Sequence, residues 1–87
     1  MASATELELN QLWQDVLGSP PSSPEANFFL EGGNSLAAMK LMGRVRRRWG
    51  QQVELRELFD NPSLRSLSER IEALSGDDKT EVSGNGR

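Results

Sequence analysis

The chain of 87 residues is long enough for one small domain, but too short to enclose a deep substrate cavity. A net charge of −3 argues against general affinity for nucleic acid, and 36% apolar with 26% charged residues is typical of a globular domain in water. No apolar run approaches the roughly 20 residues of a membrane span, and the N-terminus lacks the basic and apolar parts of a signal peptide. We therefore expect a cytoplasmic protein without nucleic-acid or membrane partners.

Two residue types are absent from the sequence. Without cysteine there is no disulfide, thiolate nucleophile or cysteine zinc site, and without histidine no Ser-His-Asp arrangement can form within the chain. Most routes to hydrolytic or redox chemistry are closed. We expect no catalytic residues, no metal site and no enzyme activity.

The first predicted helix spans residues 5–17, after an N-terminal extension of residues 1–4. Thr5 and Glu8 form a candidate capping box, and Gly18 is a typical stop. Apolar residues recur with helical period on one face and predict its core contacts: Leu9, Leu12, Trp13, Val16 and Leu17.

Residues 18–34 form a long connection, and its first part is too rich in proline, glycine and serine for regular structure. Phe28, Phe29 and Leu30 near its end argue against disorder, because their burial would attach the loop to the core. We expect one or both phenylalanines to anchor it.

The second predicted helix spans residues 35–49. Its core face consists of Ala38, Leu41, Met42, Val45 and Trp49. Leu36 and Met39 fall outside this face, along the helix edge nearest Ser35. Exposed apolar residues there would form a docking surface for partner proteins, and the alternative is that they pack under the loop or a later helix.

The same helix carries cations and no acidic residue. Lys40, Arg44, Arg47 and Arg48 point toward solvent, and Arg44 to Arg48 form a basic cluster at the helix end. Its simplest interpretation is a solvated face whose charges favour the negative end of the helix dipole. A helical nucleic-acid-binding module is the remote alternative.

Gly50 ends this helix, and residues 55–60 predict a short one with Leu55, Leu58 and Phe59 apolar. A last helix follows Pro62, with Ser63 as its N-cap. Its core face consists of Leu64, Leu67, Ile71 and Leu74, while Glu69 and Arg70 are predicted surface residues. We expect residues 75–87 to be a disordered tail.

The turn before the second helix presents one serine. Gly32 and Gly33 permit unusual backbone angles, Asn34 is a favourable N-cap, and Ser35 then becomes the first helical residue. A hydrolase elbow would need Gly-x-Ser-x-Gly and a histidine, and a nucleotide-binding loop would need a lysine after a strand. What remains is covalent modification of Ser35 by another enzyme, with an attached anion stabilised by the helix start.

Residues 28–36, FFLEGGNSL, resemble the phosphopantetheine attachment motif of carrier proteins, and of peptidyl carrier (thiolation) domains in particular. The similarity continues through residues 44–46, Trp49-Gly50, Leu58-Phe59 and residues 61–64, and covers residues 5–74.

The resemblance implies an all-α fold, an antiparallel bundle of four helices with a short third helix. It also implies that a phosphopantetheinyl transferase moves 4′-phosphopantetheine from coenzyme A onto Ser35, beside Gly33 and Asn34. The cofactor thiol would then hold an amino acid or acyl group as a thioester for nonribosomal peptide or related biosynthesis. The implied partners of this monomeric, non-catalytic carrier are an adenylation enzyme and condensation, thioesterase or tailoring enzymes.

The basic second helix and the Phe-Phe-x-x-Gly-Gly segment favour a peptidyl carrier over an acyl carrier for polyketide or fatty acyl groups, which is the alternative. Many family members carry Asp or His before the serine, where this chain has Asn34, so the choice of partner enzymes is open. The early Met1 and short polar tail suggest a free-standing carrier.

Overall fold

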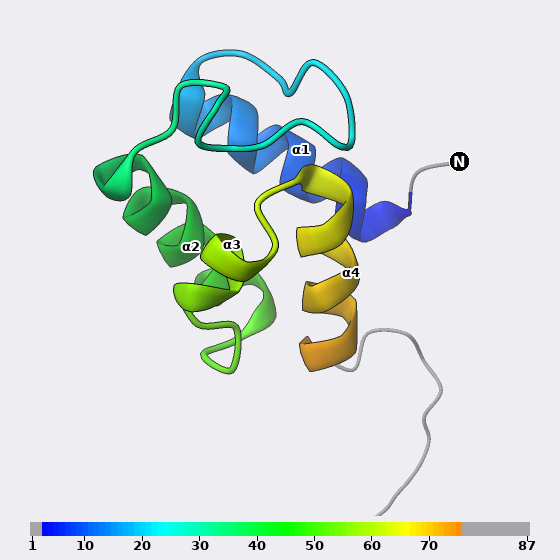
Figure 1. Ribbon diagram of the computed structural model, residues 1–87. Helices are drawn as coiled ribbons and strands as arrows, with labels where there is room; N and C mark the ends of the chain where they lie inside the picture. The colour runs from blue at the N-terminus through cyan, green and yellow to red at the C-terminus, as the bar shows by residue number, and fades with distance from the viewer. Residues whose placement is uncertain (1–2, 76–87) are drawn as a thin grey trace, which may run out of the picture.

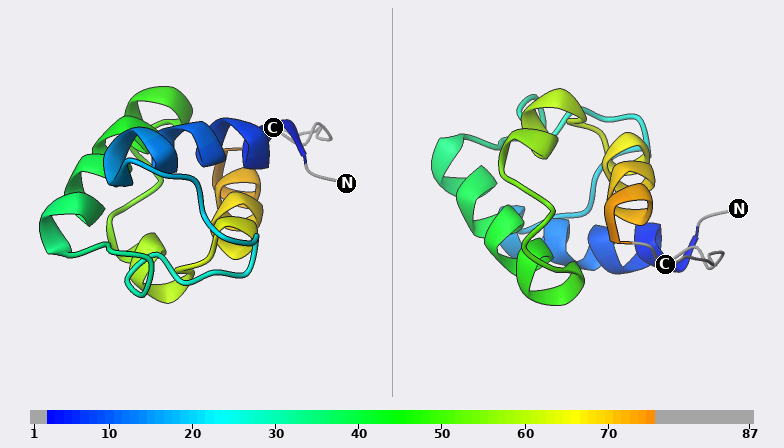
Figure 2. Two further views of the ribbon diagram at one scale, coloured as in Figure 1. Left: turned by 90° about the horizontal axis from the view of Figure 1, so that it is seen from above. Right: turned by 90° about the horizontal axis from the view of Figure 1, so that it is seen from below.

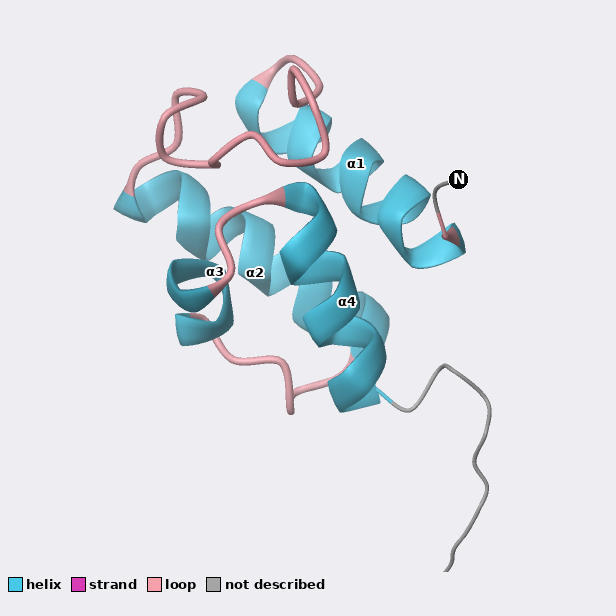
Figure 3. Cartoon of the chain, turned by 45° about the vertical axis from the view of Figure 1, so that its right-hand side comes forward, coloured by secondary structure: helices cyan, strands magenta, loops and turns pink. Residues whose placement is uncertain are grey.

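Residues 3–75 are described by a computed structural model, and they consist of helices joined by loops (Figures 1 and 3). The four helices are α1 (Ala4–Leu17), α2 (Ser35–Trp49), α3 (Arg56–Asp60) and α4 (Leu64–Ser75). Among the described residues the only β-type pairing is an isolated bridge between Asn27 and Ser63. The expectation of an all-α fold with a short third helix is confirmed.

The start of α1 differs from the prediction. Ser3 is the N-cap, and its hydroxyl accepts a hydrogen bond of 3.1 Å from the Glu6 amide. Thr5 lies inside the helix and is buried, so the predicted Thr5–Glu8 capping box is wrong. The Ser-x-x-Glu spacing exists at Ser3 as well, and the apolar pattern does not distinguish start sites two residues apart.

The core lies where α1 contacts both α2 and α4, and the helices surround it in both views of Figure 2. All five residues of the predicted α2 face are buried there, as are Leu9 and Trp13 of α1. Leu12, Val16, Leu17, Leu55 and Leu74 are partly buried and pack against this cluster. The helical periodicities therefore predicted the apolar faces correctly.

The long loop is attached to the start of α4, above which it lies in Figure 1. The Phe28 amide donates to the Pro62 carbonyl at 2.7 Å, and the Arg65 amide donates to the Pro24 carbonyl at 2.9 Å. Glu25 also forms an ion pair with Arg65. These contacts hold the loop in one path although it has no regular structure.

A row of aromatic rings continues this attachment from α1 to α3. The ring centroids of Trp13 and Phe28 lie 5.1 Å apart and those of Phe28 and Phe29 5.4 Å apart, and both pairs meet edge to face. Phe29 stacks on Phe59 with 5.2 Å between the ring centroids. Phe28 is fully buried and Phe29 partly buried, which confirms the predicted anchor. Leu30 is 86% exposed, so the expectation that it helps to attach the loop is wrong.

Phe59 and Arg70 make contacts that the local sequence pattern does not predict. Phe59 is 49% exposed, and its ring stacks on Phe29 at the surface. Arg70 is exposed, as predicted, and its Nε also donates to the carboxylate of buried Glu57 at 2.8 Å. This bond joins α3 to α4 and satisfies a charge that would otherwise be costly to bury.

At the C-terminal end, Ser75 is the last residue of α4. The rest of the predicted disordered tail, residues 76–87, lies outside the described residues. Within residues 3–75, every helix is too short or too polar to cross a bilayer.

Candidate functional site

Ser35 is exposed at the first position of α2, immediately after the loop. Asn34 precedes it in an extended conformation, and its side-chain oxygen accepts a hydrogen bond of 2.9 Å from the Ala37 amide. The Asn34 carbonyl accepts from the Ala38 amide at 2.8 Å. The predicted N-cap is confirmed, and it places the serine at the start of the helix with its backbone fixed.

The surroundings of Ser35 suit an anionic group. The side-chain and backbone oxygens of Asn34 accept hydrogen bonds from the third and fourth amides of α2. The first two amides, of Ser35 and Leu36, have no acceptor within the described part of the chain. The first turn contains no acidic residue. Four residues before Ser35, the carboxylate of Glu31 accepts hydrogen bonds from the amide and hydroxyl of Ser22, at 3.0 and 3.1 Å. A phosphate on Ser35 would therefore meet free N–H groups and the positive end of the helix dipole.

The two glycines before Asn34 serve different purposes. Gly32 has a φ of +108°, which favours glycine, as predicted. Gly33 does not have a positive φ, and the expectation of an unusual angle there is wrong. It is needed because its backbone approaches Phe28: a Cβ atom on Gly33 would lie 2.7 Å from the Phe28 carbonyl oxygen and still closer to the ring. The Gly33 amide donates to that carbonyl at 3.0 Å.

This contact leads to a prediction. Gly33→Ala is expected to destabilise the protein by about 1–3 kcal/mol, because the added methyl group must displace Phe28 or the turn. Gly43→Ala is the matched control, since nothing lies within 4 Å of a Cβ at that helical position. We expect the control to stabilise by about 0.5–1 kcal/mol. Urea unfolding measures both changes, and equal effects would contradict the proposed contact.

Leu36 and Met39 lie beside Ser35 with exposed fractions of 61% and 59%. This exposure contradicts the alternative that they pack under the loop or a later helix. Their role in docking remains a prediction. Sequence reasoning missed a groove of about 170 Å³ next to Met39, because it is formed by α2 and the segment before α3. It is lined by Met39, Met42, Gly43, Arg46 and Leu55.

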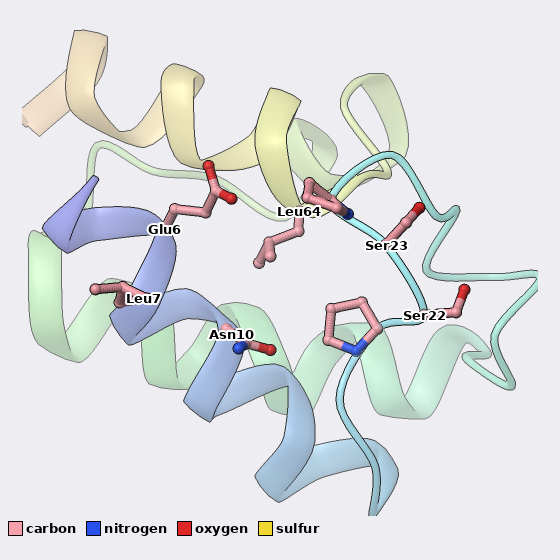
Figure 4. A pocket seen from close by; sticks show the side chains of 8 residues that line it. Glu6, Leu7, Asn10, Ser22, Ser23 and Leu64 are labelled. Atoms are coloured by element: carbon pink, nitrogen blue, oxygen red, sulfur yellow. The ribbon is translucent and has the colours of Figure 1, made fainter. Parts of the chain in front are cut away.

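Another pocket, of about 250 Å³, lies between α1, the long loop and the start of α4 (Figure 4). Asn10 and Leu64 reach toward it from the two helices, and Ser22 and Ser23 border it from the loop. Ser35 is not part of its lining. This pocket is therefore separate from the candidate attachment residue.

Comparison with known proteins gives a family match. The family model described as "Phosphopantetheine attachment site" matches residues 8–71. The chain is 40% identical over 73 residues to the dapdiamide synthesis protein DdaD of Enterobacter agglomerans, covering 84% of this chain and 13% of that protein. It is 38% identical over 68 residues to the phosphinothricin tripeptide synthetase PhsC of Streptomyces viridochromogenes, covering 78% and 6%. The chain thus spans only a small part of these relatives.

Solved structures agree with the sequence comparison. The complex of the phosphopantetheine transferase Sfp with coenzyme A and a peptidyl carrier protein contains a chain that is 30% identical, with a TM-score of 0.76 and coverage of 84% of this chain and 95% of that one. BlmI, a type-II acyl carrier protein from Streptomyces verticillus, is 26% identical with a TM-score of 0.74, covering 80% and 84%. The exposed serine, the four helices and these matches lead to one conclusion: the chain belongs to the phosphopantetheine attachment family, as a helical carrier domain of the peptidyl carrier type.

Proposed function

We propose that Ser35 is the residue that bears 4′-phosphopantetheine, and that the domain carries an amino acid or acyl group as a thioester in nonribosomal peptide or related secondary-metabolite biosynthesis. The observation that supports this most directly is the exposed Ser35 hydroxyl on the capped first turn of α2. Family membership supports the cofactor, and the names of the relatives support the class of pathway.

Loading forms a bond between the Ser35 oxygen and the phosphorus of coenzyme A that bears pantetheine. The bond from this phosphorus to the adenosine part breaks, so adenosine bisphosphate leaves. The hydroxyl proton passes to a base of the transferase or to water. Asn34 and Gly33 hold the serine at the helix start, and the amides of Ser35 and Leu36 can donate to the new phosphodiester. When bound, the cofactor supplies the thiol that this cysteine-free chain lacks.

The carrier presents its cargo to other proteins and contributes no catalytic group of its own. We propose a phosphopantetheinyl transferase and an adenylation enzyme or domain as partners, followed by condensation, thioesterase or tailoring enzymes. The domain comprises residues 5–74 and acts as a monomer in the cytoplasm. The structural similarity to a chain in complex with Sfp supports the first of these partners.

An acyl carrier for polyketide or fatty acyl groups is the second candidate, and the similarity to BlmI favours it specifically. The basic residues of α2 and the upstream Phe28-Phe29 pair favour the peptidyl assignment. Cargo distinguishes the two candidates, because a peptidyl carrier is charged by an amino-acid-activating ligase and an acyl carrier by an acyl donor.

Mass spectrometry tests the proposal in two stages. The apo protein is first incubated with coenzyme A and Sfp, and we expect the mass of one phosphopantetheine to be added on the fragment that contains Ser35. The holo protein is then offered amino acids with adenylating ligases, or malonyl and acyl donors. A protein that gains no pantetheine would contradict the attachment proposal, and charging by acyl donors alone would replace the peptidyl assignment.

A substitution tests the predicted docking residues. Met39→Asp is expected to lower kcat/KM for charging of the holo protein by its ligase about tenfold or more, because it places a charge in an apolar contact. Leu7→Asp is the matched control, since Leu7 is 60% exposed but lies on α1. Both variants should retain their melting temperature. Charging kinetics equal to those of the wild type in Met39→Asp would reject the docking role of this side chain.

A further inference from the structure

The tip of the turn before the candidate attachment residue, residues 30–32, lies outside the core. Leu30 is 86% exposed, and nothing lies within 4 Å of a Cβ atom on Gly32, which has a φ of +108°. The amides of Leu30 and Glu31 both donate to the Asn27 carbonyl at 3.0 Å. Bonds of this kind, within one turn, hold its shape but not its position on the protein.

Glu31 connects this tip to the first part of the long loop. One of its carboxylate oxygens accepts a hydrogen bond of 3.0 Å from the Ser22 amide, and the other accepts one of 3.1 Å from the Ser22 hydroxyl. The two bonds close a ring of residues 22–31. Two parallel bonds restrain the direction of the carboxylate as well as its distance, which a single bond does not. We call this pair of bonds the Ser22–Glu31 clamp.

The other side of the clamp is attached to α4. Two residues after Ser22, the Pro24 carbonyl accepts a hydrogen bond of 2.9 Å from the amide of Arg65, the second residue of α4. The base of the turn has a separate attachment, because the Phe28 amide donates to the Pro62 carbonyl at 2.7 Å. The turn is therefore held at its base by Phe28 and at its tip by the clamp.

The clamp acts next to the most flexible part of the turn. Gly32 and Gly33 follow Glu31 directly, and glycine loses more conformational freedom on ordering than any other residue. Asn34 fixes the chain after the glycines by capping α2. The clamp fixes the chain before them, so both sides of the glycine pair that leads to Ser35 are held.

We propose that Glu31 is a positioning residue for the modification of Ser35: its carboxylate, held by Ser22, keeps the glycine turn in the conformation that the transferase binds. The proposal rests on the proposed function of Ser35. Both carboxylate oxygens are engaged by Ser22, so Glu31 acts through the turn and is not a base for the serine proton. Within residues 3–75 no ion pair includes Glu31, and its charge strengthens these two bonds.

Loss of the clamp predicts a specific kinetic change. When only a fraction of a protein has the conformation that binds, its apparent affinity for the partner falls by that fraction. Once the transferase has bound the turn, the serine has its correct position and transfer proceeds as in the wild type. We therefore expect the KM for the apo protein to rise while kcat is unchanged.

The test measures loading of the full-length apo protein by Sfp and coenzyme A over a range of apo-protein concentrations. Glu31→Ala removes the clamp, and we expect its KM to rise about fivefold at the wild-type kcat. Ser22→Ala loses the hydroxyl but keeps the amide donor, so its KM should rise less. Ser22→Thr retains both donors and should have the wild-type KM. The double variant Ser22→Ala/Glu31→Ala should equal Glu31→Ala, because the clamp is already broken.

Glu25→Ala is the matched control. It removes a carboxylate from the same loop and changes the net charge by the same amount, but Glu25 pairs with Arg65 at the surface, where an ion pair contributes little. The backbone bond between Pro24 and Arg65 remains. We expect this control to have the wild-type KM. Every variant should melt close to the wild type, because the clamp is exposed and the core is unchanged.

Several results would overturn the proposal while the function of Ser35 stands. A wild-type KM in Glu31→Ala shows that the clamp is not needed, and an equal rise in Glu25→Ala shows that the charge of the loop is the cause. A fall in kcat at unchanged KM places Glu31 in the transfer step. Losses from Ser22→Ala and Glu31→Ala that add in the double variant show that the two residues act separately.

Two further outcomes separate the clamp from stability and from the attachment itself. Slower loading that accompanies a lower melting temperature assigns the clamp to the stability of the fold and also overturns the proposal. Failure of the wild type to gain pantetheine counts against the proposed function of Ser35, and the inference falls with it.

Discussion

Ser35→Ala is expected to abolish incorporation of phosphopantetheine completely. The substitution removes the oxygen that forms the new phosphorus bond, while alanine is a good helix former and Ser35 makes no side-chain hydrogen bond among residues 3–75. The Asn34 cap uses the backbone of Ala37 and Ala38 and is therefore retained. Intact-protein mass spectrometry after incubation with coenzyme A and Sfp measures the effect.

The control for this variant is Ser19→Ala, which removes a hydroxyl from an exposed position in the same loop. We expect it to be loaded like the wild type, and both variants to give the wild-type circular dichroism spectrum. If Ser35→Ala gained the same mass as the wild type, another residue would be the attachment point and the assignment of Ser35 would be wrong.

The second large effect is expected at Phe28, in the core beneath the site. Phe28→Ala should lower the free energy of unfolding by about 3–5 kcal/mol, as large-to-small substitutions of buried aromatic residues do. The substitution removes the edge-to-face contact with Trp13 and the ring against which Gly33 packs. A typical small domain has only about 5–15 kcal/mol of stability, so much of it would be lost. Urea unfolding measures the change.

Phe59→Ala is the matched control, because the same ring is removed from a site that is 49% exposed. Only its stacking on Phe29 and part of its burial are lost, so we expect a cost of about 0.5–1.5 kcal/mol. If the two variants lost equal stability, the loop would not depend on a buried anchor at Phe28. A further expected result is that Phe28→Ala slows loading at Ser35, since the turn between them loses its support.

Much of the candidate site could be predicted because its signals are local. Asn34 caps the helix through a residue three positions away, and the apolar residues of α2 recur every three or four positions. Both are properties of neighbours along the chain. The family resemblance extended these signals, and the match over residues 8–71 confirms it.

Some features were not predicted because they depend on contacts that residue spacing does not specify. Glu57 and Arg70 are 13 residues apart, so no helical spacing indicated their bond. Gly33 was attributed to backbone angle, yet it is needed because the fold brings the Phe28 carbonyl and ring against it. The capping of α1 by Ser3 in place of Thr5 is a smaller error, because two overlapping motifs compete within one turn.

Composition and short-range spacing are enough to predict the helical faces, the capped serine and the absence of any thiol in the chain. Which exposed side chains lack partners depends on how the helices and the long loop pack together. Leu30 is exposed beside an anchor that buries Phe28. Within residues 3–75 Lys40, Arg44 and Arg47 form no ion pair while other arginines do, because such differences arise only when segments far apart in the chain meet.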